Sequence, residues 1–338
     1  MPDLSIDVTN ACNRDCVHCL RDKVEQREHI QLDVFEEVLD QAKDLGIKHI
    51  GLTGGEATLH PAWSDLLQAL SERKMKFSVV SNGKEFRQKT LPTLIIPSVK
   101  RHLDCVCFSL DGACEKSHDV LRGQNSFIEV VEAANLCKLK GLPFSFKTVV
   151  SNANKAELAE IAIFATKLGA IELSYLILVP TPRLLEADLI PSYKEMRKIH
   201  SYISGSIQSS LIINVIMEGS WGDDGTLFQC NAYKQSFAVD HLGNLMFCCN
   251  LSHVCNGEKP STLGREFISD IKEQGLKKGI VGHYELLAEF TKSRLSDKTK
   301  NSGLYRYPCL WCLDYFGKLE CVKKYSDHPL INELFTQT

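Results

Sequence analysis

The sequence predicts an α/β fold built on a parallel sheet, with a smaller unit of different texture towards the C-terminus. Strand-like and helix-like runs alternate over the first part of the chain, which is the pattern of βα units. Three cysteines, Cys12, Cys16 and Cys19, directly follow the first strand-like run. The other cysteines are unevenly spread, since seven of the 14 lie from Cys230 onward.

The order of the expected elements follows from hydrophobic periodicity. Gly46 is expected to end the first helix, and Pro61 suits the first turn of the second. Strands are expected near 4–9, 47–53, 76–81, 104–110, 143–150 and 171–178, and helices near 32–45, 61–73, 126–140, 155–168 and 191–209. We expect residues 1–218 to form the α/β domain and residues 219–338 the second domain, in which 256–262 and 291–303 are polar and loop-like.

Composition excludes several classes of function. The 338 residues are 44% hydrophobic and 24% charged, which is ordinary for a soluble globular protein. A net charge of -3 gives no support for nucleic acid or a membrane surface as partner. No apolar run has the length of a membrane span, and no basic-then-apolar signal begins the chain. We therefore expect a cytoplasmic protein whose cysteines are reduced thiols or metal ligands.

Alternation along the first strand places Leu4 and Ile6 towards helices and Asp7 towards the interior. Similar inward polar positions occur on later strands, including Lys147 and Glu172. A packed barrel core would prefer Val, Ile and Leu, so the polar interior suggests a substrate chamber. Asp7, Lys147 and Glu172 are the candidate substrate contacts, although a solvated strand end explains any one of them equally well.

The three early cysteines have the spacing C-x3-C-x2-C, on a loop at the C-terminal end of a strand. Thiolates so close together suit an iron–sulfur cluster, and three ligands leave one iron of a cubane open. A structural zinc would need a fourth ligand, for which His18 is cramped. Three unrelated thiols are the remaining alternative.

A second motif, Gly54-Gly55-Glu56, follows the second strand. Two glycines allow backbone to approach a ligand closely, and Glu56 offers an acceptor to an ammonium group. Such a motif alone is usually only a turn. Its position behind the cysteine loop makes the pair of motifs specific.

Together these motifs resemble the signature of the radical S-adenosylmethionine (SAM) superfamily. The resemblance implies a partial (β/α)6 TIM-like barrel and a [4Fe–4S] cluster on Cys12, Cys16 and Cys19 whose open iron chelates SAM. Reductive cleavage would then give a 5′-deoxyadenosyl radical that abstracts a substrate hydrogen. The implied cofactor-binding residues are Gly54, Gly55, Glu56, Ser81, Asn82, Ser109, Asp111, Arg122 and Asn152. Loop capping is the alternative for Ser109 and Arg122.

The C-terminal cysteines form a second set. A hairpin around residues 238–248 has Cys230 before it and Cys248 at its far end, and Cys309 and Cys312 form a later C-x2-C. Four thiolates can close a cubane or a zinc site. The pattern resembles twitch and SPASM domains, which implies one auxiliary [4Fe–4S] cluster on these four cysteines. Zinc, or a second cluster using Cys255 and Cys321, is the alternative.

Cys249 and Cys321 are candidate hydrogen-atom donors to a substrate radical, as in epimerases of the superfamily. Packing behind the cluster is the alternative for both.

The resemblance implies an anaerobic oxidoreductase with an external electron donor such as flavodoxin or ferredoxin. We expect a maturase that modifies a peptide or protein side chain, although no peptide-recognition segment precedes Leu4. A dehydrogenase or epimerase of a small sugar or cyclitol is the alternative substrate class. An iron–sulfur electron carrier or scaffold is the alternative without catalysis, and it has no use for Glu56.

Overall fold

The computed structural model describes residues 3–21, 26–210, 213–218, 231–234, 236–251, 264–296 and 303–335. One ten-stranded sheet organises them, in the order β10-β9-β8-β1-β2-β3-β4-β5-β6-β7. Strands β1 to β7 run parallel to their neighbours, so their C-terminal ends meet at one edge. Their bounds are β1 (Asp3–Asp7), β2 (His49–Thr53), β3 (Lys76–Ser81), β4 (Leu103–Ser109), β5 (Phe144–Val149), β6 (Glu172–Leu176) and β7 (Asn214–Glu218).

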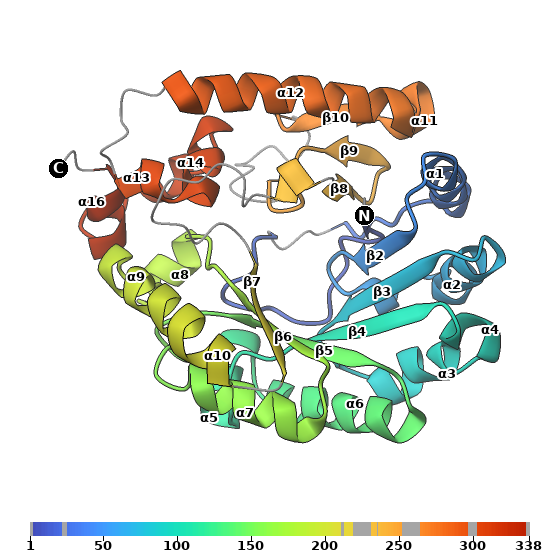
Figure 1. Cartoon of the computed structure of the whole chain (residues 1–338), viewed down its shortest axis with the longest axis horizontal. Coiled ribbons are helices and arrows are strands. Elements are labelled where there is room, and N and C mark those ends of the chain that lie inside the picture. Colours follow the sequence, from blue (N-terminus) through green and yellow to red (C-terminus); the bar gives the residue numbers. More distant parts are fainter. Residues whose placement is uncertain are drawn as a thin grey trace.

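Helices cover the outer side of the curved parallel sheet (Figure 1). Up to β7 they and the short helical turns are α1 (Leu32–Asp44), η1 (Ala57–Leu59), α2 (Trp63–Glu72), η2 (Phe86–Thr90), α3 (Leu91–Leu94), α4 (Pro97–Lys100), α5 (Glu115–Arg122), α6 (Ser126–Lys140), α7 (Leu158–Leu168), α8 (Pro182–Glu186), α9 (Tyr193–Tyr202), η3 (Ile203–Ile207) and α10 (Gln208–Ser210). None of the helices in the described ranges is both long and apolar enough to cross a membrane.

Local sequence explains the first βα unit. Leu4 and Ile6 are fully buried against helices, as alternation predicts for the outer face of β1. Helix α1 buries one stripe that includes Phe35, Val38 and Leu39, the spacing of an amphipathic helix. It ends before Gly46, whose positive φ of 77° suits glycine, so that prediction is confirmed.

The α/β fold and all six predicted strands are confirmed, with ends that differ by one or two residues. Several elements were not predicted, among them helix α5, the short helices between β3 and β4, helix α8, and β7 as a seventh parallel strand. The expectation of a loop over 291–303 is wrong for its first half, because residues 291–296 belong to the 21-residue helix α12 (Leu276–Ser296). Residues 256–262 lie outside the described part of the chain.

The predicted hairpin is confirmed as β8 (Ser236–Val239) and β9 (Asn244–Met246), which pair antiparallel. Strand β8 also pairs in parallel with β1, so the sheet continues from the barrel strands into the C-terminal part. The last strand, β10 (Phe267–Asp270), lies against α12. A Cβ at Gly279 of α12 would stand 2.5 Å from Ser269 Oγ, so this glycine lets the helix pack closely on the strands.

The remaining elements surround the second set of cysteines. Cys309 and Cys312 lie on a helix, α14 (Pro308–Tyr315), one turn apart. The other elements are η5 (Asn231–Lys234), α11 (Ile271–Gln274), α13 (Gly303–Arg306), α15 (Glu320–Lys323) and α16 (Pro329–Phe335). Figure 1 shows α12 lying across β8, β9 and α14. The predicted boundary between residues 218 and 219 stays a prediction.

Candidate functional site

The loop after β1 brings Cys12, Cys16 and Cys19 together. Cys12 is exposed, Cys16 is buried, Cys19 is half-buried, and none of the three is in a disulfide. Burial raises the pKa of the Cys16 thiol to about 11, and the positive charge of Arg122 opposes that effect. The charges of Cys12 and Cys19 also act on this pKa, so the three sulfurs and one guanidinium share a small volume. A cation beside thiolates favours the deprotonated form that ligates metal.

Distant elements fix the path of this loop. Arg183 Nη1 donates to Asp15 Oδ1 at 2.9 Å, which ties the loop to the start of α8. The Val17 N–H donates to the carbonyl of Leu121 at 2.9 Å, which ties it to α5 next to Arg122. These contacts help to fix the loop in place, as a preorganised site requires.

The Gly54-Gly55-Glu56 turn is joined to the cysteine loop by backbone hydrogen bonds. The N–H of Gly55 donates to Thr9 O and the N–H of Glu56 donates to Ala11 O, each at 2.8 Å. A Cβ at Gly54 would stand 2.4 Å from Thr9 O, and one at Gly55 would stand 2.1 Å from Ala11 O. Glycine is needed here because backbone meets backbone, whereas the sequence suggested close approach to a ligand. We call this pair of hydrogen bonds the backbone clamp.

The clamp positions the carboxylate of Glu56, which is 1% exposed. Its Oε2 accepts from the N–H of Asn82 at 2.8 Å and its Oε1 accepts from the Thr58 hydroxyl at 2.9 Å. Burial raises the pKa of Glu56, while these hydrogen bonds and one from Ser81 oppose the rise. The Glu56 charge in turn raises the pKa of Cys12, which places the carboxylate close to the first cysteine. The predicted residues Glu56, Ser81 and Asn82 therefore lie together beside the loop.

Asp111, a predicted cofactor contact, forms hydrogen bonds within the protein. Its side chain is fully buried and accepts from Arg122 Nε at 2.5 Å and from the Val149 N–H at 2.7 Å. Burial would raise the pKa of Asp111, but the Arg122 and His18 charges keep it low. Asp111 thus orients Arg122 beside Cys16, and its contact with the cofactor stays a prediction.

Asn152 is likewise used within the protein. Its amide donates to the carbonyls of Asp188 and Ile190, at 2.9 and 3.2 Å, and its oxygen accepts from Lys155. The side chain joins the loop after β5 to the segment before α9, and its contact with the cofactor stays a prediction. Ser109 is half-buried at the end of β4, and its role stays a prediction.

The polar interior contains paired charges. Lys147 on β5 forms an ion pair with Glu218 at the end of β7, and Arg21 donates to Asp7 at 2.6 Å. Glu172, the third predicted contact, accepts from Asn214 at 2.7 Å. The partners Glu218 and Arg21 were missed, because separations such as the 71 residues between Lys147 and Glu218 leave no local signal in the sequence.

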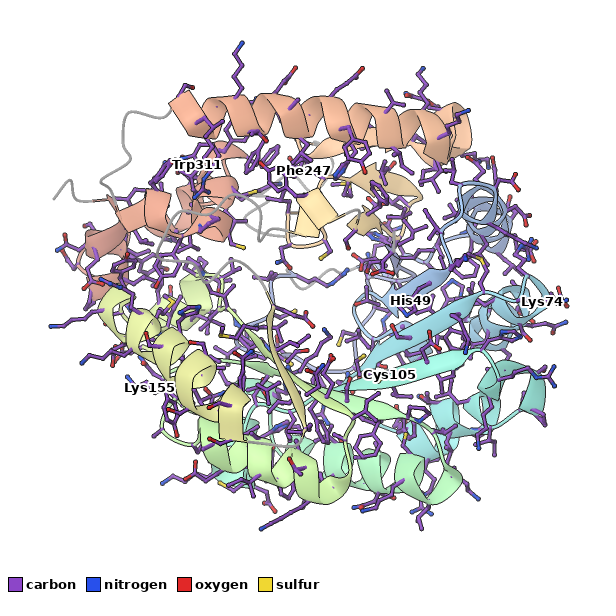
Figure 2. The ribbon with its side chains drawn as sticks, viewed as in Figure 1. His49, Lys74, Cys105, Lys155, Phe247 and Trp311 are labelled. Carbon is purple, nitrogen blue, oxygen red and sulfur yellow. The ribbon has the colours of Figure 1, made fainter. Side chains whose placement is uncertain are left out.

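Two thiols on β4 share this interior. Cys105 donates to Ser145 Oγ at 3.2 Å, and Figure 2 marks Cys105 on β4. A hydrogen bond from Cys105 and the charge of Lys147 lower the pKa of Cys107 to about 7. These contacts with Ser145 and Lys147 put both thiols on the inward face of β4.

The two candidate hydrogen donors differ. Cys249 is exposed, and a hydrogen bond with Cys248 lowers its pKa. The charges of Asp7, Glu218 and Arg21 also act on Cys249, which places this thiol near the ends of β1 and β7. Cys321 is disulfide-bonded and so has no S–H hydrogen to donate in this state.

Three of the four cysteines in the second set line a small cavity of about 40 Å³. Cys248, Cys309 and Cys312 all border it, together with the buried side chain of Arg294. Cys230, the fourth predicted ligand, and Cys255 lie outside the described residues. Within the described ranges, no three His, Cys, Asp or Glu side chains are arranged as a ready site for a metal ion.

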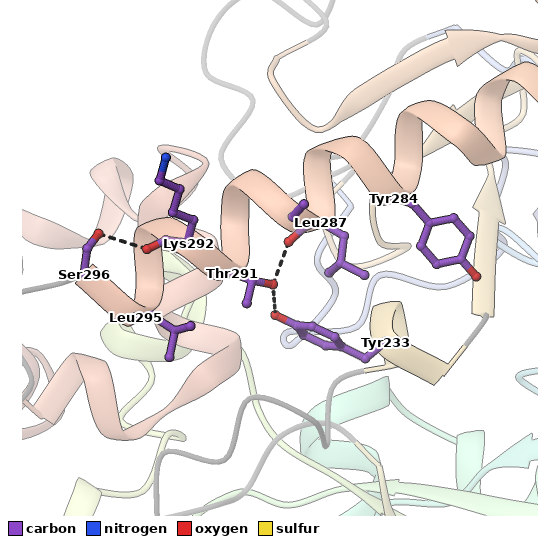
Figure 3. A pocket seen from close by; sticks show the side chains of 8 residues that line it. Tyr233, Tyr284, Leu287, Thr291, Lys292, Leu295 and Ser296 are labelled. Atoms are coloured by element: carbon purple, nitrogen blue, oxygen red, sulfur yellow. Dashed lines mark hydrogen bonds between the residues drawn. The ribbon is translucent and has the colours of Figure 1, made fainter.

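An open surface pocket of about 670 Å³ lies along α12 (Figure 3). In it the Tyr233 hydroxyl and Thr291 Oγ1 form a 2.5 Å hydrogen bond. No cysteine belongs to its lining, so it is separate from both sets of thiols. The lining residues are Tyr233, Tyr284, Leu287, Ala288, Thr291, Lys292, Leu295 and Ser296.

Comparison with known proteins relates this chain to a protein superfamily. The profile of the radical SAM superfamily matches residues 6–165, which hold the cysteine loop, Glu56 and Arg122. Mycofactocin maturase MftC of Mycobacterium tuberculosis is 25% identical over 254 residues, which cover 72% of this chain and 63% of MftC. The AdoMet-dependent heme synthase of Methanosarcina barkeri is 24% identical over 208 residues, covering 61% of this chain and 58% of the synthase.

Among solved structures, SuiB of Streptococcus suis bound to its precursor peptide SuiA has a similar fold. The TM-score is 0.68 at 20% identity, over 91% of this chain and 70% of SuiB. SuiB has also been crystallised with S-adenosylmethionine, and that structure matches with a TM-score of 0.70 at 19% identity, over 90% of this chain and 71% of SuiB. This chain therefore shares the SuiB fold, while it matches less than two thirds of the length of MftC.

Proposed function

Because residues 6–165 form a radical SAM superfamily domain, we propose that this protein is an anaerobic oxidoreductase that cleaves SAM at a [4Fe–4S] cluster on Cys12, Cys16 and Cys19. The backbone clamp is the observation that carries this proposal. It fixes a buried carboxylate beside a loop of three thiols, and an electron carrier would need no such acceptor. When bound, the cluster supplies the electron that cleaves SAM, and the resulting carbon radical takes a hydrogen from the substrate.

The residues around the cysteine loop have different roles in binding SAM and the cluster. Glu56 accepts hydrogen bonds from the SAM ammonium group, since its remaining lone pairs lie beside the cysteine loop. Asn82, whose amide nitrogen is 3.9 Å from Cys12 Sγ and 2.9 Å from Asn13 Oδ1, orders the rim of the same site. Arg122 balances the negative charge of the thiolates from the buried side, held there by Asp111.

We infer that the substrate is a peptide or protein side chain. The relatives support this class, since MftC is named a maturase and SuiB has been crystallised with a precursor peptide. The paired charges of the barrel interior, Lys147 with Glu218 and Arg21 with Asp7, would face the residue to be modified. An external electron donor such as flavodoxin or ferredoxin and a cytoplasmic location complete the proposal.

A small metabolite is the second candidate substrate. The heme synthase relative acts outside the peptide class by its name, and Cys249, which is near the ends of β1 and β7, is the candidate that would return a hydrogen atom to the substrate radical. Products made in deuterated solvent separate the outcomes. Solvent deuterium at the reacted carbon indicates quenching by a thiol and epimerisation, whereas a product two hydrogens lighter indicates oxidation or crosslinking.

The auxiliary cluster belongs to the proposal as well. Cys248, Cys309 and Cys312 are chemically suited to hold it because soft thiolates favour iron–sulfur clusters. Cys230 is proposed as the fourth ligand. This cluster would accept the electron that the substrate radical loses when it is oxidised.

The direct test is formation of 5′-deoxyadenosine from SAM under reducing, oxygen-free conditions. Cys16→Ala should abolish it. Cys137→Ala is the matched control, because Cys137 is fully buried within α6 and remote from the cysteine loop in sequence. Equal activity in the two variants would defeat the proposal.

A further inference from the structure

Arg294 is an unusual side chain for the interior of a protein. It lies near the end of α12, is fully buried, and is the largest of the completely buried side chains in the described ranges. It borders the cavity that Cys248, Cys309 and Cys312 also line. Arginine is almost never fully buried unless a partner compensates its charge.

The visible partners of Arg294 do not provide that compensation. Its Nη2 donates to the carbonyl of Tyr305 at 2.8 Å, but its Nε and Nη1 are buried without a hydrogen-bond partner among the described residues. The guanidinium lies 4.9 Å from the ring centre of Tyr305 and 5.2 Å from that of Trp311. Such ring contacts and one carbonyl offset only part of the desolvation of a buried cation.

A negatively charged group in the cavity would compensate the positive charge of Arg294. Cys312 and Arg294 border the same cavity, so a thiolate or cluster there would lie beside the guanidinium. A cluster on four thiolates is net negative and becomes more negative by one charge when it takes up an electron. Iron–sulfur potentials depend on net charge, hydrogen bonds to sulfur and solvent exposure.

The apolar walls of the cavity strengthen electrostatic interactions inside it. Phe290 is in edge contact with Trp311, at 5.2 Å between ring centres, and Phe247 packs on Phe290 at 5.4 Å. Figure 2 shows Phe247 and Trp311 beneath α12. Aromatic walls keep water out, and a fixed charge acts more strongly where the dielectric constant is low.

We propose that Arg294 is the counter-charge of the auxiliary cluster: its unpartnered nitrogens, Nε and Nη1, donate to cluster or cysteine sulfur, and its positive charge raises the cluster's reduction potential. The inference rests on the auxiliary cluster of the proposed function. Arg294 is a positioning and tuning residue and does not itself touch the substrate. A higher reduction potential makes the cluster a better acceptor for the one electron that the substrate radical gives up.

The test is a potentiometric titration followed by electron paramagnetic resonance. The full-length chain carries Cys12→Ala, Cys16→Ala and Cys19→Ala, so that only the auxiliary cluster contributes. Arg294→Gln removes the charge, and Arg294→Lys retains it. Arg265→Gln is the matched control, because Arg265 also stacks on an aromatic ring, 4.7 Å from the centre of Tyr315, but is exposed.

At the midpoint potential of the parent, we expect Arg294→Gln to lower the ratio of reduced to oxidised cluster at least tenfold, which is 59 mV for one electron. Arg294→Lys should shift the ratio less, and Arg265→Gln should leave it unchanged. A midpoint for Arg294→Gln within the scatter of Arg265→Gln, with the iron retained, overturns the proposal.

Iron content decides the remaining outcomes. If Arg294→Gln is folded by circular dichroism but loses iron while Arg294→Lys keeps it, the charge is required and the proposal stands. If both variants fold but lose iron, charge is not the property that matters and the proposal fails. It also fails if Arg294→Gln does not fold and Arg294→Lys, which keeps the charge, changes the ratio of reduced to oxidised cluster tenfold. A parent without iron removes the auxiliary cluster and this inference with it, while SAM cleavage at the first loop is judged separately by 5′-deoxyadenosine.

Discussion

Replacing Gly55 by alanine should disconnect the cysteine loop from the loop that carries Glu56. The new Cβ would stand 2.1 Å from Ala11 O, 2.5 Å from Ala11 C and 2.8 Å from Asn10 O. All three are backbone atoms, so no side-chain rotation can relieve the contact. The two strands of chain must separate, and the backbone clamp must lengthen or break.

The magnitude follows from the contacts that are lost. Two hydrogen bonds contribute about 0.5–1.5 kcal/mol each, and overpacking costs roughly 1–3 kcal/mol, so the local destabilisation is about 2–6 kcal/mol. Most of the barrel core is untouched, and the change should therefore stay local. A shift of about 1 Å in a catalytic group lowers rates by about 10²-fold, and we expect at least that loss in SAM cleavage.

Gly205→Ala is the control, since Gly205 lies in η3 with nothing within 4 Å of a new Cβ. Both variants are reconstituted without oxygen and compared for iron content, SAM affinity by calorimetry and 5′-deoxyadenosine formation. The reasoning is refuted if Gly55→Ala binds and cleaves SAM as Gly205→Ala does.

Three further predictions concern other parts of the chain. Reconstitution should give about eight irons per chain, and Cys309→Ala about four, because each cubane holds four irons; a parent value near four with zinc present would contradict the auxiliary cluster. Glu56→Gln should weaken SAM binding about 10–100-fold in calorimetry with unchanged iron, since a hydrogen bond to a charged group contributes about 1.5–3 kcal/mol; an unchanged affinity would exclude Glu56 as the ammonium acceptor. Lys155 and Ser192 lower the pKa of Glu195 to about 2. The contribution of Glu195 to the free energy of unfolding is therefore full above the ordinary glutamate pKa and is lost as the pH falls towards 2. Glu195 is 41% exposed on its side chain, which limits the effect of Glu195→Gln to about 1 kcal/mol, or about 2 °C in melting temperature at pH 7, and the difference from wild type should vanish near pH 2.

The sequence was sufficient to predict the barrel strands and the first site because their signals are local. Alternation along each strand and the spacing of Cys12, Cys16 and Cys19 can be read in short windows, and the structure puts Glu56, Ser81 and Asn82 beside them. Parallel pairing then brings strand ends to one edge whatever the loop details.

Features that depend on distant partners could not be predicted in this way. Asp111 is a carboxylate at a strand end, which suggests a ligand contact, and only the structure reveals that Arg122 and Val149 use both of its oxygens. The pairing of β8 with β1 joins segments more than 230 residues apart. Arg294 lies on the buried stripe of α12, at helical spacing from Leu287 and Phe290, but its residue type predicts exposure, because arginine is mostly found at the surface.

Hyperfine spectroscopy of the reduced protein with SAM labelled by ¹⁵N at the methionyl amine tests the central claim most directly. If the loop of Cys12, Cys16 and Cys19 leaves one iron to chelate SAM, the cluster signal should show a ¹⁵N coupling that Cys16→Ala removes. A chain that holds the reduced cluster in this loop, binds SAM and shows no such coupling would contradict the account.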